Sequence, residues 1–592
     1  MVDDAIQRAT ELQLAQHPAW LALLHYKQEV FSNRVISQAD DDAFFISAAG
    51  RTQTQAELEA AIRAFLQPAA RGHKQCAFPA RWYWLKQQLA IADKYDVSCP
   101  RMEAWLASIA TQRLTLVFPS MYLGNPGSMF GHTFLRFDGD QSVLLAQALN
   151  YAAAIDPDDN FFSYAYNGMF GGYRGVFQTR SYFETVQVYS NIENRDIWEY
   201  QLDYTPAEIQ QLARHAWELI NIRFDYFFFR ENCSYRLLTM LDAIRPEAAL
   251  TAGGAFPLAA IPVDTVRALE EKNLVREKHY RPSLASQLQA DFNRHQPGET
   301  ERVLALVEGE QRVDEIIQQV DDESQQANLL EQAYTLLQFR HQADEPRAEE
   351  LLAVRSRLKR AELAQVETPV SPELGHASMR VALGGGRQNQ RAYMNIVLRP
   401  AFHDLLDAPL GYAGGSEINV LDAQFRWFPD EDLVLLESLR FFNVVSLNPV
   451  RDWYTPLSWQ LDIRLERTWF DTTNSDMAFV TRAGGGYSYG FTHATVFAMA
   501  MLEANVSDQY VDGYSALAGA QAGASLLFDG LQLLLLAETD ESFSGFELNR
   551  DTVSAALQFN ISVSSALRLA YRKTRYALFD DEDWSARLQF YF

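Results

Sequence analysis

The C-terminal part of the chain, residues 376–592, alternates apolar and polar side chains over long stretches. In LDIRLERTW, for example, Leu461, Ile463 and Leu465 lie on one face of the expected strand, and charged residues lie on the other. About twelve such runs can be marked, and many have ten or more residues. Strands of soluble proteins are usually shorter, whereas a strand tilted across a bilayer needs about 9–11 residues. The pattern therefore predicts an antiparallel transmembrane β-barrel of about twelve strands at 371–592, in preference to a soluble sandwich with one wet face.

The last strand supports the membrane interpretation. DWSARLQFYF ends on Phe592 and places Trp584, Ala586, Leu588 and Phe590 on the same face. It resembles the C-terminal signature of bacterial outer-membrane barrels. Both ends of an even-stranded barrel emerge on one side, which in this class is the periplasm. We therefore expect a Gram-negative outer-membrane protein with its N-terminal domains in the periplasm, and with outer-membrane lipid and the barrel assembly machinery as partners.

The composition of the whole chain indicates a folded protein of several domains. With 592 residues, of which 48% are hydrophobic and 21% charged, the chain is too long for a single core. The formal net charge of −25 argues against nucleic acid as a partner, because phosphates would be repelled. The sequence contains no run of about 18 apolar residues, so no transmembrane helix is predicted. The start, MVDDAIQRATELQL, lacks the basic and apolar regions of a signal peptide, so export implies one removed before the numbering begins.

Hydrophobic periodicity divides the N-terminal part into three regions. Residues 1–110 have helical periodicity, residues 111–285 indicate a compact α+β domain, and residues 286–370 indicate a charged helical spacer. The predicted fold class is therefore a multidomain α+β protein with a C-terminal antiparallel barrel.

Six apolar segments of the α+β domain are expected to be strands, and YFETVQVYS is one of them. A capping box formed by Thr205 and Glu208 opens a helix that we expect to reach about Phe224. A second helix is expected to begin near Asn232 and to stop at Pro246.

The three cysteines suggest one disulfide and one free thiol. Cys76 and Cys99 flank a helical stretch, and each lies at a turn-like boundary near a proline. This suits a structural disulfide in an oxidising compartment and leaves Cys233 unpaired. Three reduced, partly buried cysteines are the alternative.

Cys233 and His132 are the candidate catalytic pair. His132 begins the expected strand in GHTFLRF, and Cys233 begins the expected helix in RENCSYRLL, with Asn232 as its N-cap. A thiol nucleophile needs a base, and the N–H groups at a helix start lower the pKa of the thiol. The cap would also aim free N–H groups at an oxyanion. Asn150, on the next strand, is the first choice to orient the imidazole, and Asp138 is the second.

Taken alone, one His and one Cys in a long chain more often reflect coincidence, with a buried structural cysteine. Gly127 and Gly131, which precede His132, would let the chain approach a ligand closely. A metal site is not expected, since no second pair of ligands has the required spacing, and no cofactor is expected either.

The segments GNPGSMFGHTFLRFD and NCSYRLL resemble a family of periplasmic proteins related to the Gram-positive lyso-form lipoprotein N-acyltransferase. They also resemble the wider permuted papain-like superfamily, which includes NlpC-like hydrolases and lecithin:retinol acyltransferase-like enzymes. The resemblance covers roughly residues 111–245 and assigns catalytic roles only to His132 and Cys233. The Gram-positive enzymes are embedded in the membrane through helices, whereas this chain has a barrel, and that departure puts the substrate in doubt.

The resemblance implies an outer-membrane-anchored periplasmic thiol acyltransferase or hydrolase. It would act on lipid-linked substrates, lipoprotein or phospholipid acyl chains, through an acyl-enzyme on Cys233. One alternative is a peptidoglycan amide or peptide hydrolase of the same superfamily. Another is a non-catalytic barrel that transports or docks envelope components.

Overall fold

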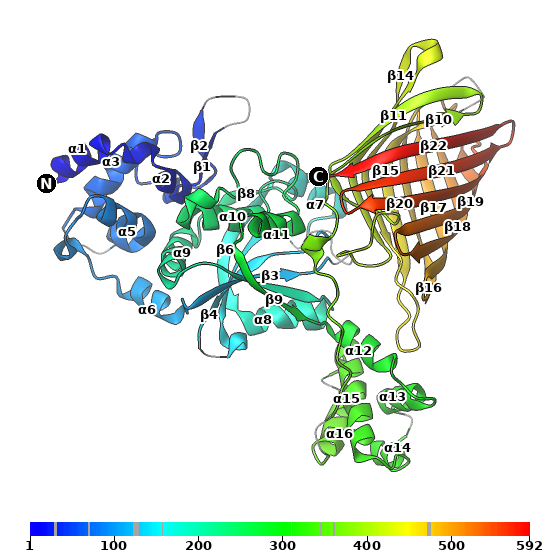
Figure 1. Cartoon of the computed structure of the whole chain (residues 1–592), viewed down its shortest axis with the longest axis horizontal. Helices are drawn as coiled ribbons and strands as arrows, with labels where there is room; N and C mark the ends of the chain where they lie inside the picture. Colours follow the sequence, from blue (N-terminus) through cyan, green and yellow to red (C-terminus); the bar gives the residue numbers. More distant parts are fainter. Residues whose placement is uncertain are drawn as a thin grey trace. The chain divides into compact units, whose positions relative to one another are not determined.

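The computed structural model describes the chain except for residues 29–31, 33, 69–71, 122–128, 141, 157, 310, 344, 359–360 and 470–474. The chain divides into two compact units: residues 1–295 together with 305–366, and residues 367–592 together with 296–304. Figure 1 labels most of the helices and strands of both units. Among the described residues, no helix is long and apolar enough to cross a bilayer.

The first hundred residues are mainly helical, as their periodicity predicts. They form α1 (Val2–Glu11), α2 (Pro18–Leu23), α3 (Thr54–Phe65), α4 (Lys74–Ala77), α5 (Pro79–Gln88) and α6 (Pro100–Ser108), with a short hairpin of β1 (Tyr26–Gln28) and β2 (Val35–Ser37). A disulfide joins Cys76 in α4 to Cys99, the N-cap of α6, with Cα atoms 5.3 Å apart. Cys233 is free and buried.

The next domain contains a seven-stranded antiparallel sheet in the order β8-β6-β5-β4-β3-β7-β9. Its strands are β3 (Arg113–Pro119), β4 (Phe134–Asp138), β5 (Gln147–Ala154), β6 (Tyr173–Ser181), β7 (Ile197–Leu202), β8 (Phe224–Tyr226) and β9 (Val275–Arg281). Its helices are α7 (Phe161–Phe170), α8 (Tyr182–Val186), α9 (Pro206–Leu219), α10 (Cys233–Ile244) and α11 (Pro262–Glu271). Every residue of β4 is buried, so the strand that follows His132 is held rigidly in the core.

Two sequence predictions in this domain are wrong. The segment YFETVQVYS is helical: α8 continues into a π-helix (Gln187–Ile192). Ser181 caps α8, and Tyr182 and Val186, one helical turn apart, are buried in one apolar cluster. Glu184 and Val188, which a strand would place on the same face as these two, are exposed. The helix α9 ends at Leu219 rather than near residue 224, because Asn221 has a positive φ of 72° and the chain then enters β8.

The spacer is helical, as expected. It contains α12 (Leu284–Phe292), α13 (Glu299–Glu308), α14 (Val313–Ile317), α15 (Glu323–Phe339) and α16 (Pro346–Arg355). Leu330, Leu336 and Leu337 of α15 are buried, so this region has an apolar core of its own.

The C-terminal unit confirms the predicted twelve-stranded antiparallel barrel (Figure 1). Its strands are β10 (Arg380–Gln388), β11 (Arg391–Arg399), β13 (Ser416–Phe428), β14 (Leu433–Ser446), β15 (Ser458–Trp469), β16 (Ser475–Phe491), β17 (Ala494–Val506), β18 (Tyr514–Phe528), β19 (Leu531–Gly545), β20 (Arg550–Ser562), β21 (Ser565–Tyr576) and β22 (Asp580–Tyr591). A three-residue strand, β12 (Ala401–His403), pairs with β13 beyond the end of β11. The ring closes because β10 pairs with both β11 and β22, and β11 pairs with β13.

The two faces of the barrel wall differ as a membrane barrel requires. On β11, Met394 is 56% and Ile396 47% exposed, whereas the alternating Tyr393 and Asn395 are each 3% exposed. The apolar side chains of the last strand, Trp584, Leu588 and Phe590, are exposed on the outer face in the same way.

Charged side chains cross the barrel interior. Arg572 of β21 lies 3.7 Å from Glu466 of β15, and these strands are six places apart in the ring of twelve, on opposite sides. Arg482 and Asp540 make a further buried contact at 2.9 Å. These interior side chains pair with one another across the barrel.

The segment that follows β12 also lies inside the barrel. Its Asp404 and Asp407 are buried and accept hydrogen bonds from Arg568 of β21 at 2.8 and 3.1 Å. Arg399 donates to Asp407 at 2.6 Å, and the Tyr591 hydroxyl does so at the same distance. The segment is thereby fixed to β11, β21 and β22.

Candidate functional site

His132 lies two residues before Phe134, the first residue of β4. Its backbone N–H donates to the carbonyl of Pro119 on β3 at 3.3 Å. The preceding Gly131 has φ +91°, and a methyl group there would lie 2.6 Å from the ring of Phe118. Only glycine fits this approach, which is to Phe118 of β3, and the expected approach to a ligand stays a prediction. Gly127 and the rest of 122–128 lie outside the described residues.

Asn150, on β5 beside β4, is the residue that contacts the imidazole. Its Oδ1 lies 2.7 Å from His132 Nε2. Asp138 does not take this role: its carboxylate accepts from Arg136 Nε and from the Thr115 hydroxyl, each at 2.6 Å. The second choice for the orienting group is therefore wrong, because a buried arginine already uses that carboxylate.

Cys233 is the first residue of α10, and its side chain is buried. Asn232 is the N-cap and accepts from the N–H of Tyr235 at 3.2 Å. The amide of Asn232 donates to the carbonyls of Phe228, at 3.0 Å, and Ala260, at 2.8 Å. Asn232 thus fixes the entry to the helix on both sides, and this positions the sulfur.

His132 and Cys233 interact directly through a side-chain hydrogen bond. Burial raises the pKa of the Cys233 thiol, but the charge and the hydrogen bond of His132 outweigh it. Further hydrogen bonds come from the Thr133 N–H and the Ser234 hydroxyl, and together these contacts lower the pKa of the thiol to about 6. Burial lowers the pKa of His132, yet the thiolate beside it and Asn150 raise that pKa above its ordinary value. The arrangement therefore favours a thiolate–imidazolium pair at neutral pH.

Tyr226 is a site residue that the sequence does not reveal. Its hydroxyl lies beside Cys233, close enough to interact with both the thiol and the backbone N–H. Burial, followed by the charge of Cys233, raises the pKa of this phenol, so it stays a neutral hydrogen-bond donor. In the sequence, Tyr226 stands in the aromatic run FDYFFF, which suggests only packing. Its position depends on the pairing of β8 with β6, two segments about fifty residues apart.

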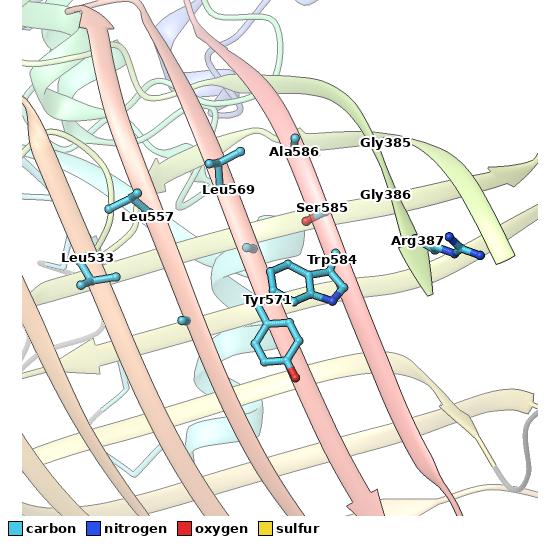
Figure 2. Close-up of a pocket in the computed structure, with 12 residues that line it drawn as sticks. Gly385, Gly386, Arg387, Leu533, Leu557, Leu569, Tyr571, Trp584, Ser585 and Ala586 are labelled. Carbon is cyan, nitrogen blue, oxygen red and sulfur yellow. The ribbon is translucent and has the colours of Figure 1, made fainter. Parts of the chain in front are cut away.

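Two features of the barrel are further candidate sites. A hollow of about 530 Å³ is lined by β19–β22 and by residues 385–387 of β10. Figure 2 shows the side chains that line it. Its lining includes the exposed side chains of Leu569 and Trp584, so it faces outward. It contains neither a thiol nor an imidazole and therefore offers no comparable chemistry.

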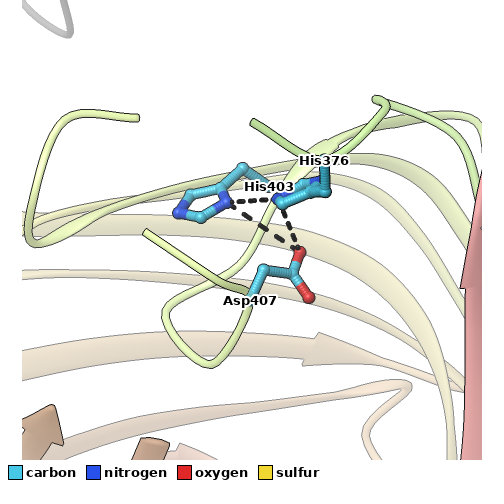
Figure 3. Close-up of side chains that lie close together, drawn as sticks. All are labelled: His376, His403 and Asp407. Carbon is cyan, nitrogen blue, oxygen red and sulfur yellow. Dashed lines mark hydrogen bonds and ion pairs between the residues drawn. The ribbon is translucent and has the colours of Figure 1, made fainter. Parts of the chain in front are cut away.

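His376, His403 and Asp407 form the second feature, inside the barrel (Figure 3). His376 Nε2 lies 2.9 Å from His403 Nδ1 and 3.7 Å from Asp407 Oδ2. No local spacing in the sequence indicates this cluster, because the two histidines are 27 residues apart. Asp407 already accepts from Arg399, and the histidines bond to each other, so hydrogen bonds account for the arrangement and we assign no metal to it.

Four family models match successive parts of the chain. Residues 101–272 match the Lnb N-terminal periplasmic domain, and this segment contains His132, Asn150, Tyr226 and Cys233. Residues 12–88, 278–366 and 369–592 match three domains of unknown function. None of the curated proteins matches the chain.

Solved structures similar to this chain include outer-membrane barrels. The KdgM porin in complex with disordered oligogalacturonate is 9% identical, covers 36% of this chain and 99% of its own, and has a TM-score of 0.22. Omp33 of Acinetobacter baumannii is 11% identical. The match covers 37% of this chain and 99% of Omp33, with a TM-score of 0.21. A loop-deletion mutant of OmpT from Vibrio cholerae is 7% identical. The match covers 37% of this chain and 97% of the OmpT mutant, with a TM-score of 0.18.

The barrel and the matched domain together locate the protein. The wall has an apolar outer face and a polar interior, the construction of outer-membrane barrels. The segment with His132 and Cys233 is similar to a periplasmic domain family. The chain is an outer-membrane β-barrel that carries an Lnb-like N-terminal domain in the periplasm.

Proposed function

We propose that this protein is an outer-membrane-anchored thiol acyltransferase or hydrolase. Its substrates would be lipid-linked acyl esters, from phospholipids or lipoproteins. The observation that carries the proposal is the contact of the Cys233 thiol, at the start of α10, with an imidazole whose Nε2 lies 2.7 Å from Asn150. A nucleophile, a base and a group that orients the base are the parts that covalent acyl transfer needs.

The reaction has two steps. The Cys233 thiolate attacks the carbonyl carbon of the ester and forms a C–S bond. The C–O bond to the leaving alcohol then breaks, and the His132 imidazolium gives that alcohol its proton, which leaves a thioester. In the second step an amine or water attacks the thioester, His132 takes the proton of the attacking group, and the thiolate leaves.

Three donors near the sulfur would stabilise the oxyanion of both steps. They are the backbone N–H of Cys233, the N–H of Thr133 and the neutral hydroxyl of Tyr226. Fixed donors aimed at developing charge are often the largest single contribution to acyl-transfer catalysis. Tyr226 would therefore be a catalytic residue in addition to His132 and Cys233.

The membrane anchor favours a lipid-linked substrate over peptidoglycan. A domain tethered to the barrel meets membrane esters at high effective concentration. The third function considered, a transport barrel, is less well supported because Arg572 and Glu466 meet across the interior. Planar-bilayer recordings of the purified protein should show no conductance steps, and porin-like steps would revive the transport interpretation.

Mass spectrometry tests the proposed chemistry. Full-length protein is incubated with phospholipid vesicles, and peptides containing Cys233 are examined for an acyl adduct. We expect a thioester adduct on Cys233 that is absent in Cys233→Ser and that hydroxylamine removes. Absence of any adduct with phospholipid, lipoprotein and soluble esters alike would refute the proposal.

A further inference from the structure

Helix α7 presents an uncovered apolar face. Its sequence, FFSYAYNGMF, contains no charged residue. Tyr166 and Phe170 are each 65% exposed and Met169 is 45% exposed, and the two aromatic rings lie 4.9 Å apart on successive turns. A surface helix that faces water normally carries charged or polar residues on that side. The exposed face of α7 is therefore suited to an apolar environment.

The opposite face of α7 is fixed to the protein. The ring of Tyr164 lies 5.0 Å from that of Phe228. The N–H of Phe228 donates to the carbonyl of Gly168 at 2.8 Å, and a methyl group on Gly168 would lie 2.2 Å from the Phe228 ring. Because one face packs this closely on Phe228, the helix holds its exposed side chains in a defined position.

The segment that α7 packs against leads to the thiol. The carbonyl of Phe228 accepts from Asn232, the cap of the helix that begins with Cys233. On the other side of this segment, the N–H of Ala260 donates to Phe229 at 2.6 Å, and the nearby Leu258 is 46% exposed. Exposed apolar side chains thus flank the residues that position the nucleophile.

We propose that Tyr166, Met169 and Phe170 of α7, together with Leu258, form a lipid-docking surface, here called the α7 surface. It enters the acyl-chain region of the periplasmic leaflet of the outer membrane. The barrel of the same chain keeps the domain at this membrane, and the α7 surface supplies the face that meets it. Tyr, Phe, Met and Leu side chains are suited to the boundary between headgroups and acyl chains.

Charge favours a neutral lipid as the occupant. The chain has a formal net charge of −25, so an anionic surface would be repelled. An uncharged helix on an acidic protein fits a zwitterionic phospholipid. The inference rests on the proposed function in one respect: insertion beside Phe228 would bring the ester of such a lipid close to Cys233.

Photo-crosslinking tests the docking without reference to catalysis. A photoreactive phenylalanine analogue replaces Phe170 in the full-length protein, which is reconstituted in vesicles of zwitterionic phospholipid. The matched control carries the analogue at Phe183 of α8, which is 48% exposed. We expect a lipid adduct at position 170 and none at position 183. A protein–protein crosslink at 170, equal lipid labelling at both positions or no lipid adduct at 170 would overturn the proposal.

Kinetics test the link to the thiol. In Tyr166→Ser/Phe170→Ser, the rate of Cys233 acylation by vesicle phospholipid, relative to that by a short-chain water-soluble ester, should fall at least about tenfold, because the docked protein no longer buries two aromatic side chains in the membrane. Phe183→Ser should leave this ratio unchanged. An unchanged ratio in the double variant would overturn the docking role while leaving the thiol chemistry intact. If the wild type is acylated by neither substrate, the proposed function fails, and crosslinking alone decides the docking.

Discussion

The thiol site and the barrel interior both bury ionisable groups, but they hold them in different ways. In the barrel, Asp407 has Arg399, Arg568 and Tyr591 as partners, and Arg572 reaches across the interior to Glu466. In the periplasmic domain, Cys233 and His132 are each other's partners of opposite charge, and their other hydrogen bonds come from neutral groups such as Asn150.

This difference separates a structural network from a reactive pair. Charges with several partners resist change in their protonation and hold strands together, and removing one member leaves the others unpaired in a buried place. A pair in which each ion has one partner of opposite charge exchanges a proton readily, so its ionisation is available for chemistry. Substitutions at the thiol site should therefore lower activity, whereas substitutions in the barrel interior should lower stability.

The largest effect is expected at His132. His132→Ala removes the base and the imidazolium that holds the thiolate, so the rate of Cys233 acylation should fall by about 10²–10⁴. The stability of the barrel should not change. The adduct is followed by mass spectrometry over time, with the exposed His279→Ala as control. A rate in His132→Ala within about threefold of wild type would exclude general-base catalysis by this residue.

The corresponding change in the barrel is Asp407→Ala. It removes one of the two buried carboxylates, Asp404 and Asp407, that Arg399 and Arg568 share, and should destabilise the barrel by roughly 3–5 kcal/mol. The temperature at which the compact form unfolds on gels measures this loss. Asp580→Ala, which breaks the exposed pair with Lys573, is the matched control and should shift this unfolding temperature little. If Asp407→Ala were as stable as this control, the interior network would not be structural.

A smaller effect is expected at Asn150. Asn150→Ala removes the hydrogen bond to His132 Nε2, a contact worth about 1.5–3 kcal/mol when the partner is charged. The acylation rate should fall about tenfold or more, with the protein still folded. Asn150→Asp restores an acceptor oxygen and should recover part of the rate. A rate unaffected by Asn150→Ala would show that β4 alone orients the imidazole.

The sequence predicted the features that rest on local patterns. Alternation over long strands was enough for the barrel, and the helix start at Asn232 and the strand after His132 were visible in short segments. The helix at residues 182–192 was missed because YFETVQVYS also alternates, and tertiary burial of Tyr182 with Val186 decided its structure. Tyr226 and the cluster of His376, His403 and Asp407 depend on pairings between distant segments, which no local pattern contains.

The central claim is that His132 holds Cys233 as a thiolate, and the pH dependence of Cys233 alkylation tests it most directly. The rate of labelling by iodoacetamide is measured from pH 4 to 10 in full-length wild type and in His132→Ala, with Cys233→Ser as the blank. Labelling should rise with pH as the thiol loses its proton, with a midpoint near the pKa of about 6. In His132→Ala the midpoint should move up to the roughly 8.5 of a free thiol or higher, because burial then acts unopposed. A wild-type midpoint at or above that of a free thiol, or one that His132→Ala does not move, would contradict the account.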